Sequence, residues 1–111
     1  MTWTKLGSEF PDECAHVDLS DAAFRTHVEA IAYLYRLRRD DCRFNKRALR
    51  RFATSDDVNG AVRELLDQGF WTPHGDEYEV QHHGDVIRDS LAAQEAKRDR
   101  DRKAQQRARA K

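Results

Sequence analysis

The chain has 111 residues, of which 39% are hydrophobic and 36% are charged, so we expect one domain with a modest core and a strongly ionic surface. No apolar run approaches the length of a membrane span, and no hydrophobic stretch follows Met1. We therefore expect a cytoplasmic protein that does not contact a membrane. Cys14 and Cys42 lack a CxxC spacing and are expected to be free thiols in a reducing compartment.

The zero net charge hides alternating blocks of opposite sign. Residues 1–35 hold two basic and six acidic side chains, whereas residues 36–51 hold eight basic and two acidic ones. Residues 52–96 hold two basic and ten acidic side chains, and residues 97–111 again hold eight basic and two acidic ones. Two segments of net charge +6 on an otherwise acidic chain indicate surfaces that face a polyanion.

The N-terminal third of the chain predicts an arm, a turn and a long helix. Trp3, Leu6 and Phe10 are large, apolar and close together, which indicates an arm that packs on the domain. The Phe-Pro-Asp sequence at residues 10–12 is typical of a turn. Ser20 suits the N-cap of a helix over residues 21–37, in which apolar residues recur at spacings of three and four.

The middle of the chain predicts a helix-turn-helix. A basic helix is expected over residues 45–53 and a second helix over residues 56–68, joined by a turn at residues 54–55. Asn45 and Ser55 are the residues expected to cap these two helices, because their side-chain oxygens can accept from unpaired backbone N–H groups.

A β-hairpin is expected over residues 70–80, preceded by Gly69 in the left-handed conformation that ends many helices. A short strand at residues 42–44 is expected to pair with this hairpin. The predicted fold class is therefore mainly α with a small β wing, that is, a winged helix-turn-helix followed by a C-terminal basic helix. We place the winged-helix domain and its N-terminal arm at residues 1–81.

The C-terminal part, residues 82–111, predicts a helix and a basic tail. Val86, Ile87 and Leu91 supply a short apolar stripe, which then thins to alanines. Residues 97–111 contain strong helix formers but no core face, so we expect either a solvated helix or a frayed tail.

The winged-helix interpretation assigns DNA contacts to particular side chains. Asn59 can pair with adenine and Arg63 with guanine, so these two exposed residues of the second helix are the candidates for reading base edges. Cations on the first helix and the tail would neutralise phosphates, and Ser55 at a helix N-terminus would approach one. The phosphate candidates are Arg43, Lys46, Arg47, Arg50, Arg51, Ser55, Lys97, Arg98, Arg100, Arg102, Lys103, Arg107 and Arg109.

The second helix is acidic where it would meet DNA. Asp56, Asp57, Glu64 and Asp67 stand on it against one arginine, and carboxylates repel phosphates. The alternative function is therefore a protein-protein adaptor or dimerisation module that docks a replication or transcription partner. A homodimer is compatible with either hypothesis.

No constellation of catalytic residues is visible. The chain has no glycine-rich phosphate loop, no nucleophile elbow and no paired carboxylates with a matching base. Its histidines and cysteines fit no standard zinc spacing, and His27, at the apolar edge of the long helix, is expected in the core. We therefore expect a protein that is not an enzyme and that has no metal site and no cofactor.

Five segments carry a family resemblance: TWTKLGSEFPDE, DLSDAAFRTHVEAI, KRALRRFA, AVRELLDQGFW and GDEYEV. Through them, residues 2–80 resemble small winged-helix proteins of actinobacteria, their phages and integrated mobile elements. Some of those proteins are similar to the N-terminal domains of replisome-organiser or replication-initiation proteins. The resemblance implies binding of double-stranded DNA in replication initiation or transcriptional regulation, with Asn59 and Arg63 exposed on the recognition helix.

Overall fold

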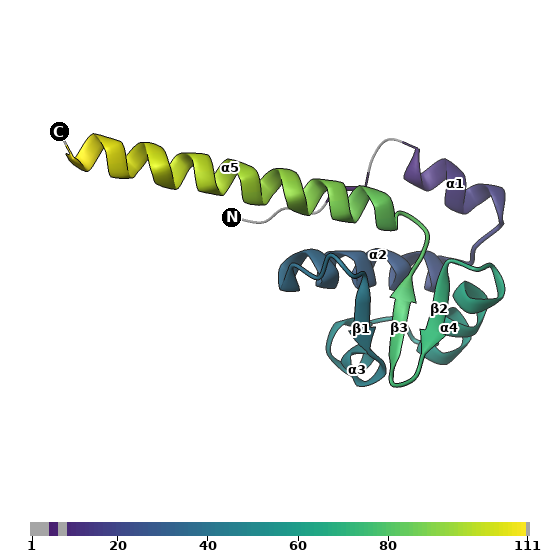
Figure 1. Ribbon diagram of the computed structural model, residues 1–111. Helices are drawn as coiled ribbons and strands as arrows, with labels where there is room; N and C mark the ends of the chain where they lie inside the picture. The colour runs from purple at the N-terminus through teal and green to yellow at the C-terminus, as the bar shows by residue number, and fades with distance from the viewer. Residues whose placement is uncertain (1–4, 7–8, 111) are drawn as a thin grey trace.

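The computed structural model describes residues 5–6 and 9–110, and it is mainly helical with a small three-stranded antiparallel sheet. In Figure 1 the helix α2 lies in the middle, with the sheet, α3 and α4 on one side of it and α5 on the other. The elements in chain order are α1 (Phe10–His16), α2 (Asp21–Leu37), β1 (Arg43–Asn45), the 3-10 turn η1 (Lys46–Ala48), α3 (Leu49–Phe52), α4 (Val58–Asp67), β2 (Trp71–His74), β3 (Glu77–Val80) and α5 (Gly84–Ala110).

Helix α2 has the predicted bounds and the predicted cap. The Oγ of Ser20 accepts a hydrogen bond from the backbone N–H of Ala23 at 3.1 Å, which satisfies one unpaired donor of the first turn. Ala30, Ile31 and Leu34 on this helix are fully buried. α2 packs against α3, α4 and α5, so its apolar stripe is the centre of the core.

The turn predicted at residues 10–12 is wrong, because these residues begin the helix α1. Pro11 stands in the first turn, where a missing backbone N–H removes no helical hydrogen bond. Phe10 is fully buried, as expected for the N-terminal arm, and its ring stacks on that of His27 with centroids 5.4 Å apart. Leu6 of the arm is half-buried and packs against the core, whereas Trp3 lies outside the described residues.

The first helix of the predicted helix-turn-helix is shorter and less regular than expected. Residues 45–53 form the 3-10 turn η1 and a single α-helical turn, α3, instead of one helix. Asn45 is the cap as predicted, because its side chain accepts from the N–H of Arg47 at 2.8 Å.

The second helix, α4, begins at Val58 rather than at residue 56, and Ser55 is not its cap. Asp57 takes that place and accepts from the N–H of Gly60 at 3.0 Å, whereas Ser55 Oγ accepts from the N–H of Asp57 at 3.3 Å. The physical reason lies in α2: the carboxylate of Glu29 accepts from the Thr54 amide at 3.2 Å and from its hydroxyl at 2.7 Å. These bonds hold the connection outside a helix, so α4 starts later.

The predicted hairpin and its partner strand are confirmed. The strands β2 and β3 pair antiparallel with Trp71 opposite Val80, and β1 pairs with the other edge of β3, which gives the order β1-β3-β2. Gly69 and Gly75 have φ of +73° and +60°, the conformations that the end of α4 and the hairpin turn require.

Helix α5 begins at Gly84 and continues to Ala110, so the C-terminal segment is a solvated helix and not a frayed tail. Ile87, Leu91 and Gln94 are buried, and the side chains of residues 95–109 are exposed apart from half-buried Asp99. Residues 95–110 therefore project about 24 Å as a helix past the end of α2 (Figure 1). Within the described residues, no helix is long and apolar enough to cross a membrane.

A chain of hydrogen bonds runs through the core from β2 to α1. Trp71 Nε1–H donates to His27 Nδ1 at 3.0 Å, His27 Nε2 lies 3.0 Å from His82 Nδ1, and His82 Nε2 bonds the Glu13 carboxylate. Because the indole can only donate, neutral His27 holds its proton on Nε2 and donates to His82, which donates in turn to Glu13. His27 is fully buried, which confirms its predicted place in the core.

Helix α4 is joined to the start of α2 by a carboxylate clamp. The Glu64 carboxylate accepts from both the backbone N–H and the hydroxyl of Ser20, each at 2.7 Å. The carboxylate also lies next to the N-terminus of α2, where the helix dipole favours negative charge. Glu64 is thus a structural residue that ties the two helices together.

Replacing Glu64 with alanine is expected to lower the free energy of unfolding by about 1–2 kcal/mol, because two hydrogen bonds to a charged group are removed at an exposed position. Urea unfolding followed by circular dichroism measures this change. Asp67→Ala is the matched control, since Asp67 stands on the same helix, is exposed and has no partner among the described residues. Equal losses of stability in the two variants would contradict the clamp.

Candidate nucleic-acid interface

The segment formed by η1 and α3 carries a group of unpaired cations. Arg47, Arg50 and Arg51 are exposed, and no carboxylate among the residues that the structure describes pairs with them. The 3-10 turn and the short helix place these arginines on the surface because Ala48 and Phe52 point into the core. Three uncompensated guanidinium groups on one short segment suit the binding of phosphates.

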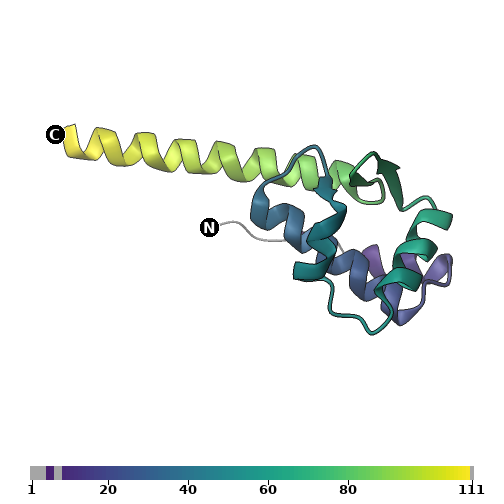
Figure 2. The same ribbon diagram turned by 90° about the horizontal axis from the view of Figure 1, so that it is seen from below.

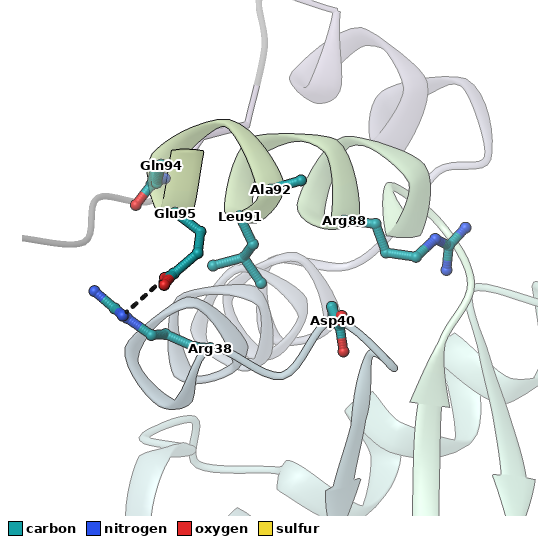
Figure 3. A pocket seen from close by; sticks show the side chains of 7 residues that line it. All are labelled: Arg38, Asp40, Arg88, Leu91, Ala92, Gln94 and Glu95. Carbon is teal, nitrogen blue, oxygen red and sulfur yellow. Dashed lines mark hydrogen bonds and ion pairs between the residues drawn. The ribbon is translucent and has the colours of Figure 1, made fainter. Parts of the chain in front are cut away.

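The arginines Arg38, Arg39 and Arg43, which precede this segment, form ion pairs with carboxylates of the same chain. Arg39 pairs with Asp41 at 2.7 Å, and Arg43, a predicted phosphate contact, pairs with Glu79 on β3 at 3.0 Å. Arg38 and Glu95 point toward one another across the space between the end of α2 and α5, 3.3 Å apart, in a pocket of about 270 Å³ (Figure 3).

These pairs also reduce the negative charge of the hairpin. Glu77 lies 3.5 Å from Arg39, and Glu79 accepts from Arg43 and from Gln81. Partial burial alone would raise the pKa of Glu79, but the hydrogen bonds and the positive charge of Arg43 hold it below its ordinary value. Both hairpin glutamates are therefore compensated by nearby arginines.

The two predicted base-reading residues lie together on α4. Asn59 and Arg63 are exposed, stand one helical turn apart, and border an open depression of about 370 Å³ between α3, α4 and β3. Tyr78 of β3 also lines this depression, and Lys46 Nζ lies 4.9 Å from the centroid of its ring. One predicted phosphate contact, Lys46, is thus linked through the ring of Tyr78 to the depression that both base candidates border.

The carboxylates at and before the start of α4 and along it differ in whether they bond within the protein or face solvent. Glu64 is clamped to Ser20, and Asp57 caps its own helix, so neither is directed at a ligand of the exposed face. Asp56 and Asp67 are exposed on the surface. Two of the four acidic residues predicted on this helix are therefore engaged in hydrogen bonds within the protein.

Ser55, the remaining predicted phosphate contact in this region, is not at a helix N-terminus. It lines a depression together with three carboxylates, those of Asp21, Asp56 and Asp57. The reason for placing a phosphate there no longer holds, because the residue does not cap α4 and its surroundings are acidic.

The basic end of α5 forms a second group of cations. Arg102 is bonded to Asp99 on the same helix, and the other predicted contacts are exposed without a carboxylate partner among the described residues. They are Lys97, Arg98, Arg100, Lys103, Arg107 and Arg109. In Figures 1 and 2, α3 lies on the side of the body toward which α5 projects, and α4 and α1 lie on the far side. The two positive segments are therefore at the same end of the molecule, on opposite sides of α2.

The sequence predicts Leu49 and Tyr78 in the core because of their apolar character, although the ring of Tyr78 is also of a kind that stacks on bases. Both are half-buried and face the depression beside Asn59. A partial signal was present on β3, where apolar and charged residues alternate as they do in a half-exposed strand. Among the described residues, no three His, Cys, Asp or Glu side chains are placed to hold a metal ion.

Comparisons with protein-family models, with curated proteins and with solved structures find no match to this chain. The geometry of the surface is therefore the basis for assigning a function.

Proposed function

We propose that the chain is a winged helix-turn-helix protein that binds double-stranded DNA. The proposal is supported by the order of elements, α2-β1-α3-α4-β2-β3, and by the sheet order β1-β3-β2, in which the β2–β3 hairpin forms the wing. In this arrangement α4 is the recognition helix, and the segment η1–α3 lies against the phosphate backbone. As part of this proposal, the protein belongs to a phage or mobile element and acts in replication initiation or transcriptional regulation.

The observation that carries the proposal is that Asn59, Arg63 and Tyr78 border one depression and that Lys46 contacts the Tyr78 ring. Arginines of η1 and α3 that pair with no carboxylate among the described residues lie nearby in the sequence. The amide of Asn59 and the guanidinium of Arg63, the two candidates for reading base edges, lie on one open surface with other cations nearby. Phosphate contacts would position the duplex and α4 would meet the base edges. The projecting half of α5 would add affinity that does not depend on sequence.

Affinity for a duplex of random sequence, measured by fluorescence anisotropy from about 50 to about 200 mM salt, tests this function. The logarithm of the association constant is expected to fall against the logarithm of salt with a slope of about −3.6 or steeper, because Lys46 and the three arginines of η1–α3 would each neutralise one phosphate. Absence of salt-sensitive binding would contradict the proposal.

A specific observation also favours a second candidate, the protein-protein adaptor. Asp21, Asp56 and Asp57 surround an open depression of about 280 Å³ on the acidic part of the surface, with Arg25 at its edge. A basic partner would fit this surface by charge. Loss of binding to a replication or transcription partner on Asp56→Asn, in a protein that does not bind DNA, would support this candidate over the first.

A further inference from the structure

The depression between α3, α4 and β3 has an apolar floor. Leu49 and Leu66 are half-buried, Val62 is 7% exposed, and the ring of Tyr78 closes the side formed by the sheet. The elements α3, α4 and β3 therefore leave a patch of apolar surface open to solvent between them. The volume of about 370 Å³ is large enough for a flat group to rest on this floor.

The rim of the depression is polar and positive. Asn59 and Arg63 stand on its α4 edge, and Tyr78, which borders it from β3, has Lys46 Nζ 4.9 Å from the centroid of its ring. Leu66 is three residues from Arg63, so these two side chains are neighbours on the helix surface. An occupant of this site has to offer an apolar group to the floor, hydrogen-bonding edges to an amide, and negative charge to the two cations.

One component of DNA meets all three conditions. In the major groove a thymine presents its C5-methyl group, and the adenine paired with it presents the N6 donor and N7 acceptor that an asparagine amide can bind bidentately. The adjoining phosphates supply the negative charge. A guanine–cytosine pair offers no methyl group to the floor.

Resting on the DNA-binding function proposed above, we propose that this depression receives the methyl group of thymine, with Asn59 paired to the adenine of the same base pair. Leu66 and Tyr78 form the contact with the methyl group. Burial of one methyl group is worth about 0.8 kcal/mol, which corresponds to about a fourfold gain in affinity for each methyl group received.

The test compares an alternating dA-dT duplex with the same duplex carrying deoxyuridine in place of every thymine, because this change removes only the methyl groups. Fluorescence anisotropy with the full chain at one salt concentration gives the ratio of the two affinities. We expect a ratio of about fourfold or more in favour of thymine. In Leu66→Ala the ratio of the two affinities is expected to fall toward one. Partial unfolding of this variant would lower both measured affinities by the same factor, so it would leave their ratio unchanged.

Two further variants complete the experiment. Asn59→Ala is expected to weaken binding to both duplexes while the ratio persists, because adenine recognition is removed and the floor is intact. Gln68→Ala, an exposed change on α4 away from the depression, is expected to leave both affinities unchanged. A ratio of one with salt-sensitive binding to both duplexes would overturn this inference and leave DNA binding in place. No salt-sensitive binding to either duplex would overturn the proposed function itself.

Discussion

Lowering the pH from about 7 to about 5 is expected to reduce the free energy of unfolding by about 2 kcal/mol, with a slope that approaches about 1.4 kcal/mol for each pH unit once the unfolded histidine is mostly protonated. The cause is His27, which is fully buried and whose pKa is lowered from 6.5 to about 3 by burial and, to a smaller extent, by the charges of His82 and His83. The unfolded histidine takes up a proton in this range and the folded one does not. The unfolded state therefore binds more protons and is favoured as the pH falls.

The hydrogen-bond chain explains why His27 resists protonation. Its Nδ1 accepts from Trp71 Nε1–H, so a proton on Nδ1 would set two N–H groups against each other. Its Nε2 already carries the proton that it donates to His82. A protonated His27 would place a positive charge in the core without a neighbouring carboxylate among the described residues to pair with it, which would raise the free energy of the folded state. His83, whose pKa is also lowered, first by burial, changes stability in the same direction.

Urea unfolding between about pH 7 and about pH 5 measures this slope, since few carboxylates titrate there. His27→Gln is the informative variant: its amide can still accept from Trp71 and donate to His82, but it does not titrate. We expect it to be less stable than the wild type at neutral pH and to have a much shallower dependence on pH. The same slope in both proteins would exclude His27 as the cause.

Replacing Arg47, Arg50 and Arg51 together with glutamine is expected to make the salt slope of DNA binding less negative by about 2.7, that is, about 0.9 for each phosphate that is no longer neutralised. Between about 50 and about 200 mM salt, the affinity of the variant would then fall about 40-fold less than that of the wild type. All three side chains are exposed, so folding is expected to be retained, and circular dichroism verifies this.

The matched control is the triple variant of Arg38, Arg39 and Arg43 to glutamine. It removes the same number of charges from the same basic block of sequence, but these side chains form ion pairs with Glu95, Asp41 and Glu79 in the fold. We expect its slope to stay close to that of the wild type. Equal changes in the two triple variants would show that net charge, and not the placement of the cations, sets the affinity.

The regular parts of the fold were predictable because their signals are local. The bounds of α2, the capping of that helix by Ser20, the hairpin and its glycines all follow from spacing and turn chemistry within a few residues. The errors arose where a distant residue changes the local preference. Glu29 on α2 binds Thr54 and shifts the start of α4, and the burial of Phe10 draws the segment at residues 10–12 into a helix.

The sequence by itself determined that two positive blocks exist, that they flank an acidic middle, and that Asn59 and Arg63 share one exposed helix face. Only the tertiary structure decided that Arg38 and Arg43 are compensated, because their ion pairs with Glu95 and Glu79 join side chains that are tens of residues apart. Arg43 meets Glu79 across the sheet, whereas Arg47 meets no carboxylate among the described residues. The same reason applies to the apolar depression, which exists only where α3, α4 and β3 come together.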